Sequence, residues 1–321
     1  MSSLPETSNP LISVVVVTWN AKRYVEECLS SLRMHAPRGT EVIVVDNASS
    51  DGTPQLVPDN FPEVRLIANP ANYGFARGNN IGIAASRGRY LFLVNSDVNV
   101  PAGCFQKIIE YMDTHPEVGL LGPQMLGPHR EIRRSTMRTP TLLNLLGRAL
   151  ALDSMLRGTR WAGGFLMGDF AHDRTREVEV LNGWFWVARR EAIKQVGGLD
   201  EQFFMYGEDL DWCYRFRAAG WKLVFLADAS AIHYGGMSSA AAPEHFYLEM
   251  QRANLQYWTK HHGALSSIAF RAVTALHELV RIAGYAVIRL VKRPVRSEAT
   301  HKIRRSRGSL SWMLRSSGAR Q

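Results

Sequence analysis

The stretch ISVVVVT, which spans Ile12–Thr18, decides the fold expected of this chain. A continuous run of β-branched residues, without alternation, is typical of a strand covered on both faces. Further apolar runs follow it as EVIVVD (Glu41–Asp46), VRLIA (Val64–Ala68) and YLFLVN (Tyr90–Asn95). Helical patterns lie near residues 24–34, 75–86 and 102–115. Strands that alternate with helices predict an α/β protein with a doubly wound, mostly parallel sheet and flanking helices.

Polar residues gather where three of these strands end. They are Thr18 and Asn20 after the first strand, Asp46 after the second, and Asn95, Ser96 and Asp97 after a later one. A carboxylate at the end of a buried strand loses solvation unless something there needs it. A turn is the alternative, because Asn, Ser and Asp side chains bond to nearby backbone. Ligands of doubly wound sheets bind beyond the carboxyl ends of the strands, so three such clusters favour a ligand site.

The segment NYGFARGNNIG (Asn72–Gly82) places Gly74, Gly78 and Gly82 four residues apart. On a helix these glycines share one face. Each costs about 1 kcal/mol relative to alanine, which indicates that something approaches the backbone closely. The approaching group is either a ligand or the sheet itself, and the spacing is not the dinucleotide-binding GxGxxG.

The second half of the chain carries acidic residues and a histidine. Val178–Phe204 is expected to contain a strand, a helix from Arg189 and a Gly-Gly stop; the acids Glu208, Asp209 and Asp211 then begin a helix. The helix macrodipole favours acids in a first turn, so capping alone explains one or two of them. His233 follows the strand KLVFLAD (Lys222–Asp228). A lone histidine is usually structural, but its place after a strand end also suits a metal ligand.

Composition bounds the class of protein. The 321 residues are 46% hydrophobic, which is enough for a large core. Three scattered cysteines argue against a disulfide framework and fit a reducing compartment. No signal peptide is expected from the N-terminus. Of the net charge of +9, residues 292–321 hold +8, from nine Lys and Arg and one acid. The nearly neutral remainder argues against a nucleic-acid partner.

The C-terminal region is predicted to form amphipathic helices, followed by a basic tail. Between Ser266 and Val291 the apolar runs are broken too often for a spanning helix, by Arg271, His277, Glu278, Arg281 and Arg289. At 100° per residue these fall within about a third of the circumference. The opposite side holds Ile268, Leu276, Leu279, Ala283, Val287 and Leu290. We expect this helix to lie on an anionic membrane surface. Packing on the catalytic domain or on a partner chain is the alternative.

The motifs VVVVTWN, VVDNASSDGT, NYGFARGNNIG, FLVNSDV and GGLDEQFFMYGEDLDWCYR, followed by His233, occur in the order seen in family 2 glycosyltransferases. The chain resembles this family over about residues 10–240, most closely its bacterial rhamnosyltransferase-like branch. The resemblance implies a GT-A fold, inverting chemistry, a nucleotide-diphosphate sugar donor and Mg²⁺ or Mn²⁺. The expected domains are a flexible lead (1–10), a GT-A domain (11–242, with a nucleotide-binding half 11–125 and an acceptor half 126–242), C-terminal helices (243–291) and a basic tail (292–321).

The resemblance also assigns roles to residues. Asn95-Ser96-Asp97 matches the DxD motif with only its last acid kept, so Asp97 and His233 would hold the metal. Thr18, Asn20 and Asp46 would line the nucleoside pocket, with Asn72, Arg77 and Asn80 as further candidates, and Ser238 or Ser239 would touch the diphosphate. Asp209 matches the catalytic base, and Glu208 would position it or the acceptor.

These assignments predict transfer of a sugar, with rhamnose as one candidate, to a glycan or lipid-linked acceptor in cell-surface polysaccharide synthesis. The expected place is the cytoplasm, peripheral to the inner face of the membrane, and a homo-oligomer is left open. Two rivals remain. A nucleotidyltransferase would share the sheet, the nucleotide and the metal, but should carry a Gly-rich basic loop where this chain has TWNAKRY. A catalytically silent membrane-binding module would not need the Glu208-Asp209 pair.

Overall fold

A computed structural model describes residues 10–152, 167–235, 243–291, 294 and 296–315 of the chain. The fold divides into two compact units. The first, called the sheet unit, comprises Met1–Met137, Ala171–Phe204 and Glu208–Ser238. The second, called the helical unit, comprises Arg138–Phe170, Met205–Gly207 and Ser239–Gln321.

The sheet unit is built on a mixed sheet whose central strands run in the order β3-β2-β1-β4-β11-β6-β12-β5. These strands are β1 (Ile12–Thr18), β2 (Glu41–Asp46), β3 (Arg65–Ala68), β4 (Tyr90–Asn95), β5 (Val98–Asn99), β6 (Val118–Leu126), β11 (Phe185–Arg189) and β12 (Lys222–His233). β7 (Ile132–Arg133) pairs with β6 and β9 (Arg176–Glu177) with β12, while β8 (Thr136–Met137) and β10 (Val180–Leu181) pair separately. The first four strands are parallel, as expected, whereas β11 is antiparallel to both of its neighbours.

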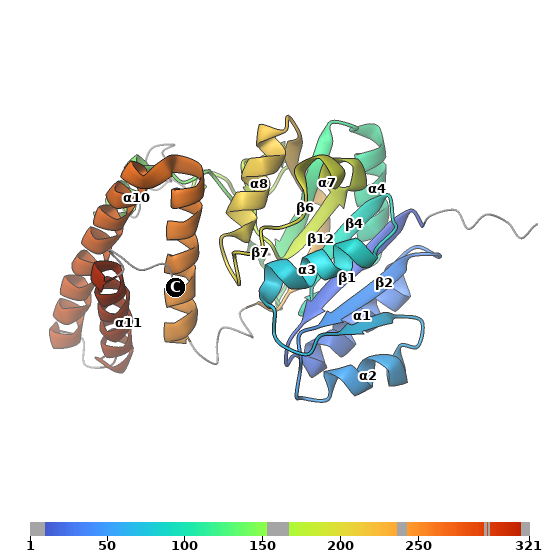
Figure 1. Ribbon diagram of the computed structural model, residues 1–321, viewed down its shortest axis with the longest axis horizontal. Helices are drawn as coiled ribbons and strands as arrows, with labels where there is room; N and C mark the ends of the chain where they lie inside the picture. Colours follow the sequence, from blue (N-terminus) through green and yellow to red (C-terminus); the bar gives the residue numbers. More distant parts are fainter. Residues whose placement is uncertain (1–9, 153–166, 236–242, 292–293, 295, 316–321) are drawn as a thin grey trace, which may run out of the picture. The chain divides into compact units, whose positions relative to one another are not determined.

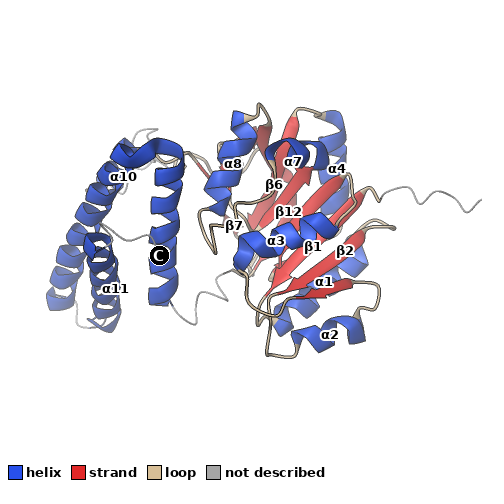
Figure 2. Cartoon of the chain, viewed as in Figure 1, coloured by secondary structure: helices blue, strands red, loops and turns tan. Residues whose placement is uncertain are grey.

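Helices cover both faces of this sheet (Figure 1), and Figure 2 separates the strands in red from the helices in blue. The helices are α1 (Lys22–His35), α2 (Thr53–Asn60), α3 (Gly74–Ala85), α4 (Cys104–Thr114), α7 (Arg190–Val196) and α8 (Glu208–Ala218). Val14 and Val16 join a core with α1, α2 and α4, while Val15 and Val17 face α3. Both faces of β1 are therefore buried, which confirms the reading of ISVVVVT.

The glycines of α3 allow close packing of this helix on the sheet. A Cβ atom at Gly78 would lie 2.8 Å from Val17 Cγ1, and one at Gly82 would lie 2.2 Å from Val15 Cγ1. Real Cβ atoms do not approach so closely, so a larger residue would push the helix away from β1. Of the two explanations for the glycine repeat, helix–sheet packing is the one that the structure supports at these two positions.

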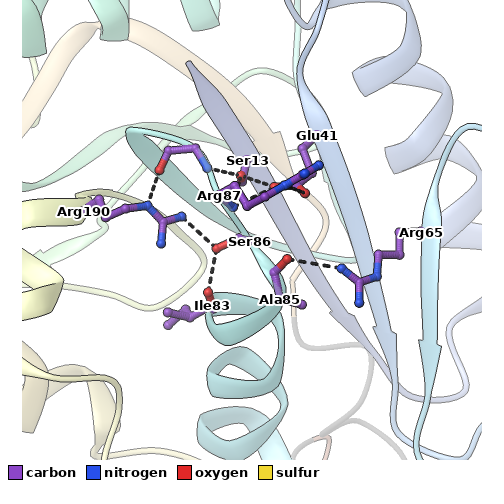
Figure 3. A network of polar contacts seen from close by, with 9 residues as sticks. Ser13, Glu41, Arg65, Ile83, Ala85, Ser86, Arg87 and Arg190 are labelled. Atoms are coloured by element: carbon purple, nitrogen blue, oxygen red, sulfur yellow. Dashed lines mark hydrogen bonds and ion pairs between the residues drawn. The ribbon is translucent and has the colours of Figure 1, made fainter. Parts of the chain in front are cut away.

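A polar network ties the strands together at their amino ends (Figure 3). The Ser13 hydroxyl donates to Glu41 and accepts a hydrogen bond from Gly88 N at 2.7 Å. Arg190 donates to Gly88 O and, at 3.0 Å, to Ser86 Oγ. Burial acts to raise the pKa of Glu41, but hydrogen bonds from Ser13 and Arg87 outweigh it and hold that pKa below its usual value. The amino ends of the strands are therefore held by contacts within the sheet unit.

The helical unit contains α5 (Leu142–Ala149), α10 (Pro243–Val291) and α11 (Arg296–Arg315). Gly263, with φ of 77°, interrupts α10, which therefore consists of two helical segments. Thr141 and Asn144 form a capping box at the start of α5. Among the described residues, no helix is long and apolar enough to cross a membrane.

Candidate active site

The carboxyl ends of β1, β2 and β4 lie side by side. In the sheet register Thr18 pairs with Asp46, and Val17 pairs with Asn95. The sequence prediction that these polar residues share one edge of a parallel sheet is confirmed.

Two buried polar atoms at this edge lack hydrogen-bond partners within the part of the chain that the structure describes. They are Thr18 Oγ1 and Asp46 Oδ1, on residues only 2% and 1% exposed. The other carboxylate oxygen of Asp46 accepts from Ser49 N at 2.9 Å. An unpaired buried polar atom costs about 1–3 kcal/mol. A ligand that offers an N–H or O–H to Asp46 and bonds to the Thr18 hydroxyl would remove that cost, as a nucleoside can.

Asn20 joins the loops that follow the first two strands. Its side-chain oxygen accepts from Ser50 N at 2.8 Å, and its backbone N–H donates to Ser49 Oγ at 2.8 Å. Its φ of 50° lies in the left-handed region, which asparagine tolerates better than most residues. Asn20 therefore shapes the loops around Thr18 and Asp46 in this structure.

Asp97 and His233 meet at a second point of the sheet unit. The ends of β5 and β12 pair antiparallel, with His233 opposite Val98. His233 Nε2 lies 3.1 Å from Asp97 Oδ1, and both side chains are more than four-fifths buried. Gly235 N donates to Asp97 Oδ2 at 3.0 Å. The carboxylate and the imidazole are therefore held together by the backbone around them.

This pair fits a divalent cation. Octahedral Mg²⁺ with bonds of about 2.1 Å places neighbouring ligand atoms about 3.0 Å apart, close to the separation of Asp97 and His233. Among the described residues, no group of three or more His, Cys, Asp or Glu side chains is arranged to hold a metal. Two protein ligands are nevertheless sufficient for a cation that also binds water and substrate phosphates.

The acids at the start of α8 differ in their surroundings. Asp211 is fully buried, and its ion pair with Arg215, at 2.8 Å, holds the arginine against Val196 O and Gly198 O. Asp211 is therefore structural. Asp209 is only half-buried and accepts from Leu210 N at 2.8 Å, so its carboxylate is the more accessible one.

Glu208 is 6% exposed, and its Oε2 has no hydrogen-bond partner among the described residues. Burial raises the pKa of Glu208, and the neighbouring Asp209 carboxylate raises it further. Glu208 therefore keeps its proton at a pH at which a solvated glutamate has lost it. A neutral Glu208 can donate a hydrogen bond, whereas Asp209 beside it can accept one.

Glu208→Gln is expected to stabilise the protein increasingly as pH rises from about 4.5, the ordinary pKa of glutamate. Below that pH both folded and unfolded states hold the proton, so the variant gains nothing. Above it, the folded wild type keeps a proton on Glu208 that the unfolded chain releases. Keeping that proton lowers the free energy of unfolding by about 1.4 kcal/mol for each tenfold difference in proton affinity between the two states. We expect a Tm gain of several degrees near neutral pH, measured by thermal unfolding across the pH range. Glu179→Gln, which removes an exposed carboxylate, is the control; a Tm difference independent of pH would contradict the assignment.

The other predicted nucleotide-sugar residues have local roles in the structure. Asn72 accepts from Gly74 N at 2.9 Å. On α3, Asn80 bonds Leu199 N and O, both at 2.8 Å, and Arg77 lies 3.8 Å from Glu201. Arg77 and Asn80 thus hold the loop after the Gly-Gly stop.

Asn95 and Ser96 are half-buried at the end of β4, where Asn95 N donates to Trp184 O at 3.0 Å. Ser238 and Ser239 lie outside the described residues.

Sequence reasoning missed Trp184, which contacts His233, and the nearby Asn182. The Trp184 ring stacks on His233, with 5.4 Å between ring centroids and an interplanar angle of 24°. Asn182, two residues earlier, has a buried Oδ1 without a partner among the described residues. Both lie between the short strands β10 and β11, which the sequence suggested as one strand. A tryptophan in a run of apolar residues carries no local sign of such a role.

The mixed, mostly parallel sheet with flanking helices has the GT-A fold, which solved glycosyltransferase structures share. A mannosyltransferase from Pyrobaculum calidifontis, solved with GDP-Man and Mn²⁺, matches with a TM-score of 0.58 at 17% identity, covering 97% of this chain and 89% of that chain. TarS from S. aureus, residues 1–349, matches with a TM-score of 0.50 at 16% identity, covering 97% and 93%.

The sequence comparisons identify the family. The model of glycosyl transferase family 2 matches residues 13–197. An N-acetylglucosaminyl-diphospho-decaprenol L-rhamnosyltransferase of Mycobacterium tuberculosis is 30% identical over 244 residues, 73% of this chain and 79% of the relative. A low-salt glycan biosynthesis hexosyltransferase of Haloferax volcanii is 23% identical over 87% of this chain and 84% of its own length. The chain belongs to glycosyl transferase family 2 and is a glycosyltransferase similar to the rhamnosyltransferases.

Proposed function

We propose that this enzyme transfers a sugar, with inversion, from a nucleotide-diphosphate sugar to a hydroxyl of a glycan or lipid-linked acceptor in cell-envelope glycan synthesis. The observation that carries the proposal is that buried atoms of Thr18 and Asp46 at the strand ends lack partners among the described residues. The same sheet unit holds Asp97 against His233. The first pair suits a nucleoside and the second suits a diphosphate with its cation. The name of the mycobacterial relative supports L-rhamnose as the sugar and a polyprenyl-diphosphate sugar as the acceptor.

In the proposed reaction, Asp209 takes the proton of the acceptor hydroxyl as its oxygen attacks the anomeric carbon. The bond from that carbon to the diphosphate oxygen breaks on the opposite face, which inverts the configuration. Asp97 and His233 would hold Mg²⁺ or Mn²⁺, which supplies Lewis-acid neutralisation of the diphosphate when bound. Neutral Glu208 donates a hydrogen bond that orients Asp209 or the acceptor.

The proposed place of action is the inner face of the cytoplasmic membrane, where a polyprenyl-linked acceptor is anchored. The three cysteines are free and buried, which is consistent with a reducing compartment.

Incubation with nucleotide-diphosphate sugars, rhamnose donors included, and a polyprenyl-diphosphate acceptor tests this function. We expect release of nucleoside diphosphate that depends on acceptor, together with a glycosylated acceptor of inverted anomeric configuration. Donor binding should also raise Tm in the presence of Mn²⁺ or Mg²⁺. Pyrophosphate release would identify a nucleotidyltransferase instead, and binding without turnover would identify a silent module.

A further inference from the structure

The segment of α10 that follows Gly263 buries polar residues and exposes apolar ones, the reverse of an ordinary surface helix. The buried residues of this segment are Ser267, Phe270, Thr274 and Glu278, and only one of these four is apolar. They recur at spacings of three and four, so they form one face of the helix. Polar side chains therefore occupy the face that the helical unit buries.

The charged residues predicted for this face make contacts inside the helical unit. Arg271 donates to Met313 O of α11, and Glu278 accepts from Tyr247 Oη. Arg281 donates to Tyr285 Oη at 3.3 Å. The charged side of the segment is therefore in part its packed side.

The opposite side of the segment is apolar and exposed. It consists of Leu265, Ile268, Ala272, Leu276, Leu279, Ala283, Val287 and Leu290, called here the apolar stripe. Leu265, Ile268, Val287 and Leu290 are 82%, 64%, 60% and 74% exposed. The stripe recurs every three or four residues along the whole segment, so it is a continuous surface rather than scattered side chains.

The stripe ends beside a basic hollow. A hollow of about 560 Å³ is lined by Leu290 and by Arg289, Arg296, Ser297, Thr300 and His301. Two guanidinium groups and the Ser297 hydroxyl suit the phosphate of a lipid headgroup, whereas the Thr300 hydroxyl donates to Arg296 O at 2.8 Å. Arg307 and Arg315 are further exposed cations of α11. An apolar strip with a basic hollow beside it suits the boundary of an anionic bilayer, where acyl chains and lipid phosphates meet.

We propose that the apolar stripe and the basic hollow form a docking surface for an anionic membrane. The stripe enters the boundary between headgroups and acyl chains, and Arg289 and Arg296 bind lipid phosphates. This docking deepens the proposed function, because a lipid-linked acceptor would then lie in the surface on which the enzyme sits. A second copy of the chain is the other occupant that such a stripe could take.

The test is co-sedimentation of the full-length protein with vesicles of phosphatidylcholine, alone or mixed with phosphatidylglycerol, at low and high salt. We expect binding to the anionic vesicles that weakens with salt. Ile268→Glu/Val287→Glu should reduce the partition coefficient about tenfold or more, because two apolar side chains leave the interface. Met34→Glu is the matched control, since it replaces a side chain 74% exposed on α1 of the sheet unit. Arg289→Glu/Arg296→Glu should remove the preference for anionic vesicles.

Equal sedimentation of the wild type and Ile268→Glu/Val287→Glu, or no binding by the wild type, would overturn the proposal. A wild-type dimer in solution that this variant converts to monomer would overturn it in favour of self-association. Nucleotide-sugar binding, followed by Tm, should be unchanged in every variant. A protein that binds vesicles but turns over no nucleotide sugar would refute the proposed function and leave the docking surface standing.

Discussion

Asp209→Asn is expected to abolish sugar transfer while the nucleotide sugar and the divalent cation still bind. Asparagine cannot accept the acceptor's proton, and a general base contributes about 10²–10⁴-fold to a rate. The variant should fold, because the oxygen that accepts from Leu210 N is kept in an amide. Acceptor-dependent release of nucleoside diphosphate measures kcat, and a donor-induced rise in Tm measures binding.

Two comparisons make this result specific. Glu179→Gln removes an exposed carboxylate of the same unit, which lies 3.8 Å from Arg217, and should leave kcat unchanged. Asp211→Asn breaks the buried ion pair with Arg215 and should lower Tm. If Asp209→Asn keeps more than about a tenth of the wild-type rate, a loss below about 1.4 kcal/mol, Asp209 is not the base.

Removal of Asp97 or His233, the proposed metal ligands, should have the second largest effect on activity. Asp97→Ala and His233→Ala are each expected to weaken Mn²⁺ binding, and donor binding in the presence of Mn²⁺, by about 100-fold or more. Loss of an outer partner of a metal site already costs about 10–100-fold, and these residues would be direct ligands. A chelator should remove wild-type activity. Electron paramagnetic resonance titration with Mn²⁺ and calorimetry with the donor give two readouts that do not depend on turnover.

His115→Ala is the matched control, because His115 stacks on Tyr111, with 4.0 Å between ring centroids, outside the candidate site. His233→Gln serves as a second variant, since glutamine can still hydrogen-bond Asp97 but gives up the imidazole. Wild-type activity that survives the chelator would mean that Asn95-Ser96-Asp97 is only a turn. The leaving group would then be stabilised by arginine or lysine side chains.

The sequence by itself determined the parallel half of the sheet and its polar edge. Runs such as ISVVVVT show strand identity and two-sided burial locally, because β-branching and continuous apolarity act over a few residues. Parallel strands necessarily bring their carboxyl ends to one edge, so Thr18, Asp46 and Asn95 could be placed together before any contact was known. The register confirms that placement.

Only the tertiary structure decided which side chains meet across long separations. The distance between Asp97 and His233 depends on the pairing of β5 with β12. Because β5 has only two residues, its sequence is too short to predict that pairing. The insertion of antiparallel β11 between β4 and β6 is equally non-local. The raised pKa of Glu208 follows mainly from burial, which the local sequence does not encode, and only further from the adjacent Asp209.

In the C-terminal helix α10, too, the sequence determined one feature and the tertiary structure another. Periodicity alone separated a charged side from an apolar side in Ser266–Val291, because 100° per residue fixes which residues share a face. The sequence left open which side packs within the protein. In the structure, Glu278 is buried and Ile268 is exposed. That outcome depends on the partner helix α11, whose buried Ser306 and Ser309 are small, polar and distant in the chain. Helical periodicity is a local property, whereas the face that a helix buries is set by the surface it packs against.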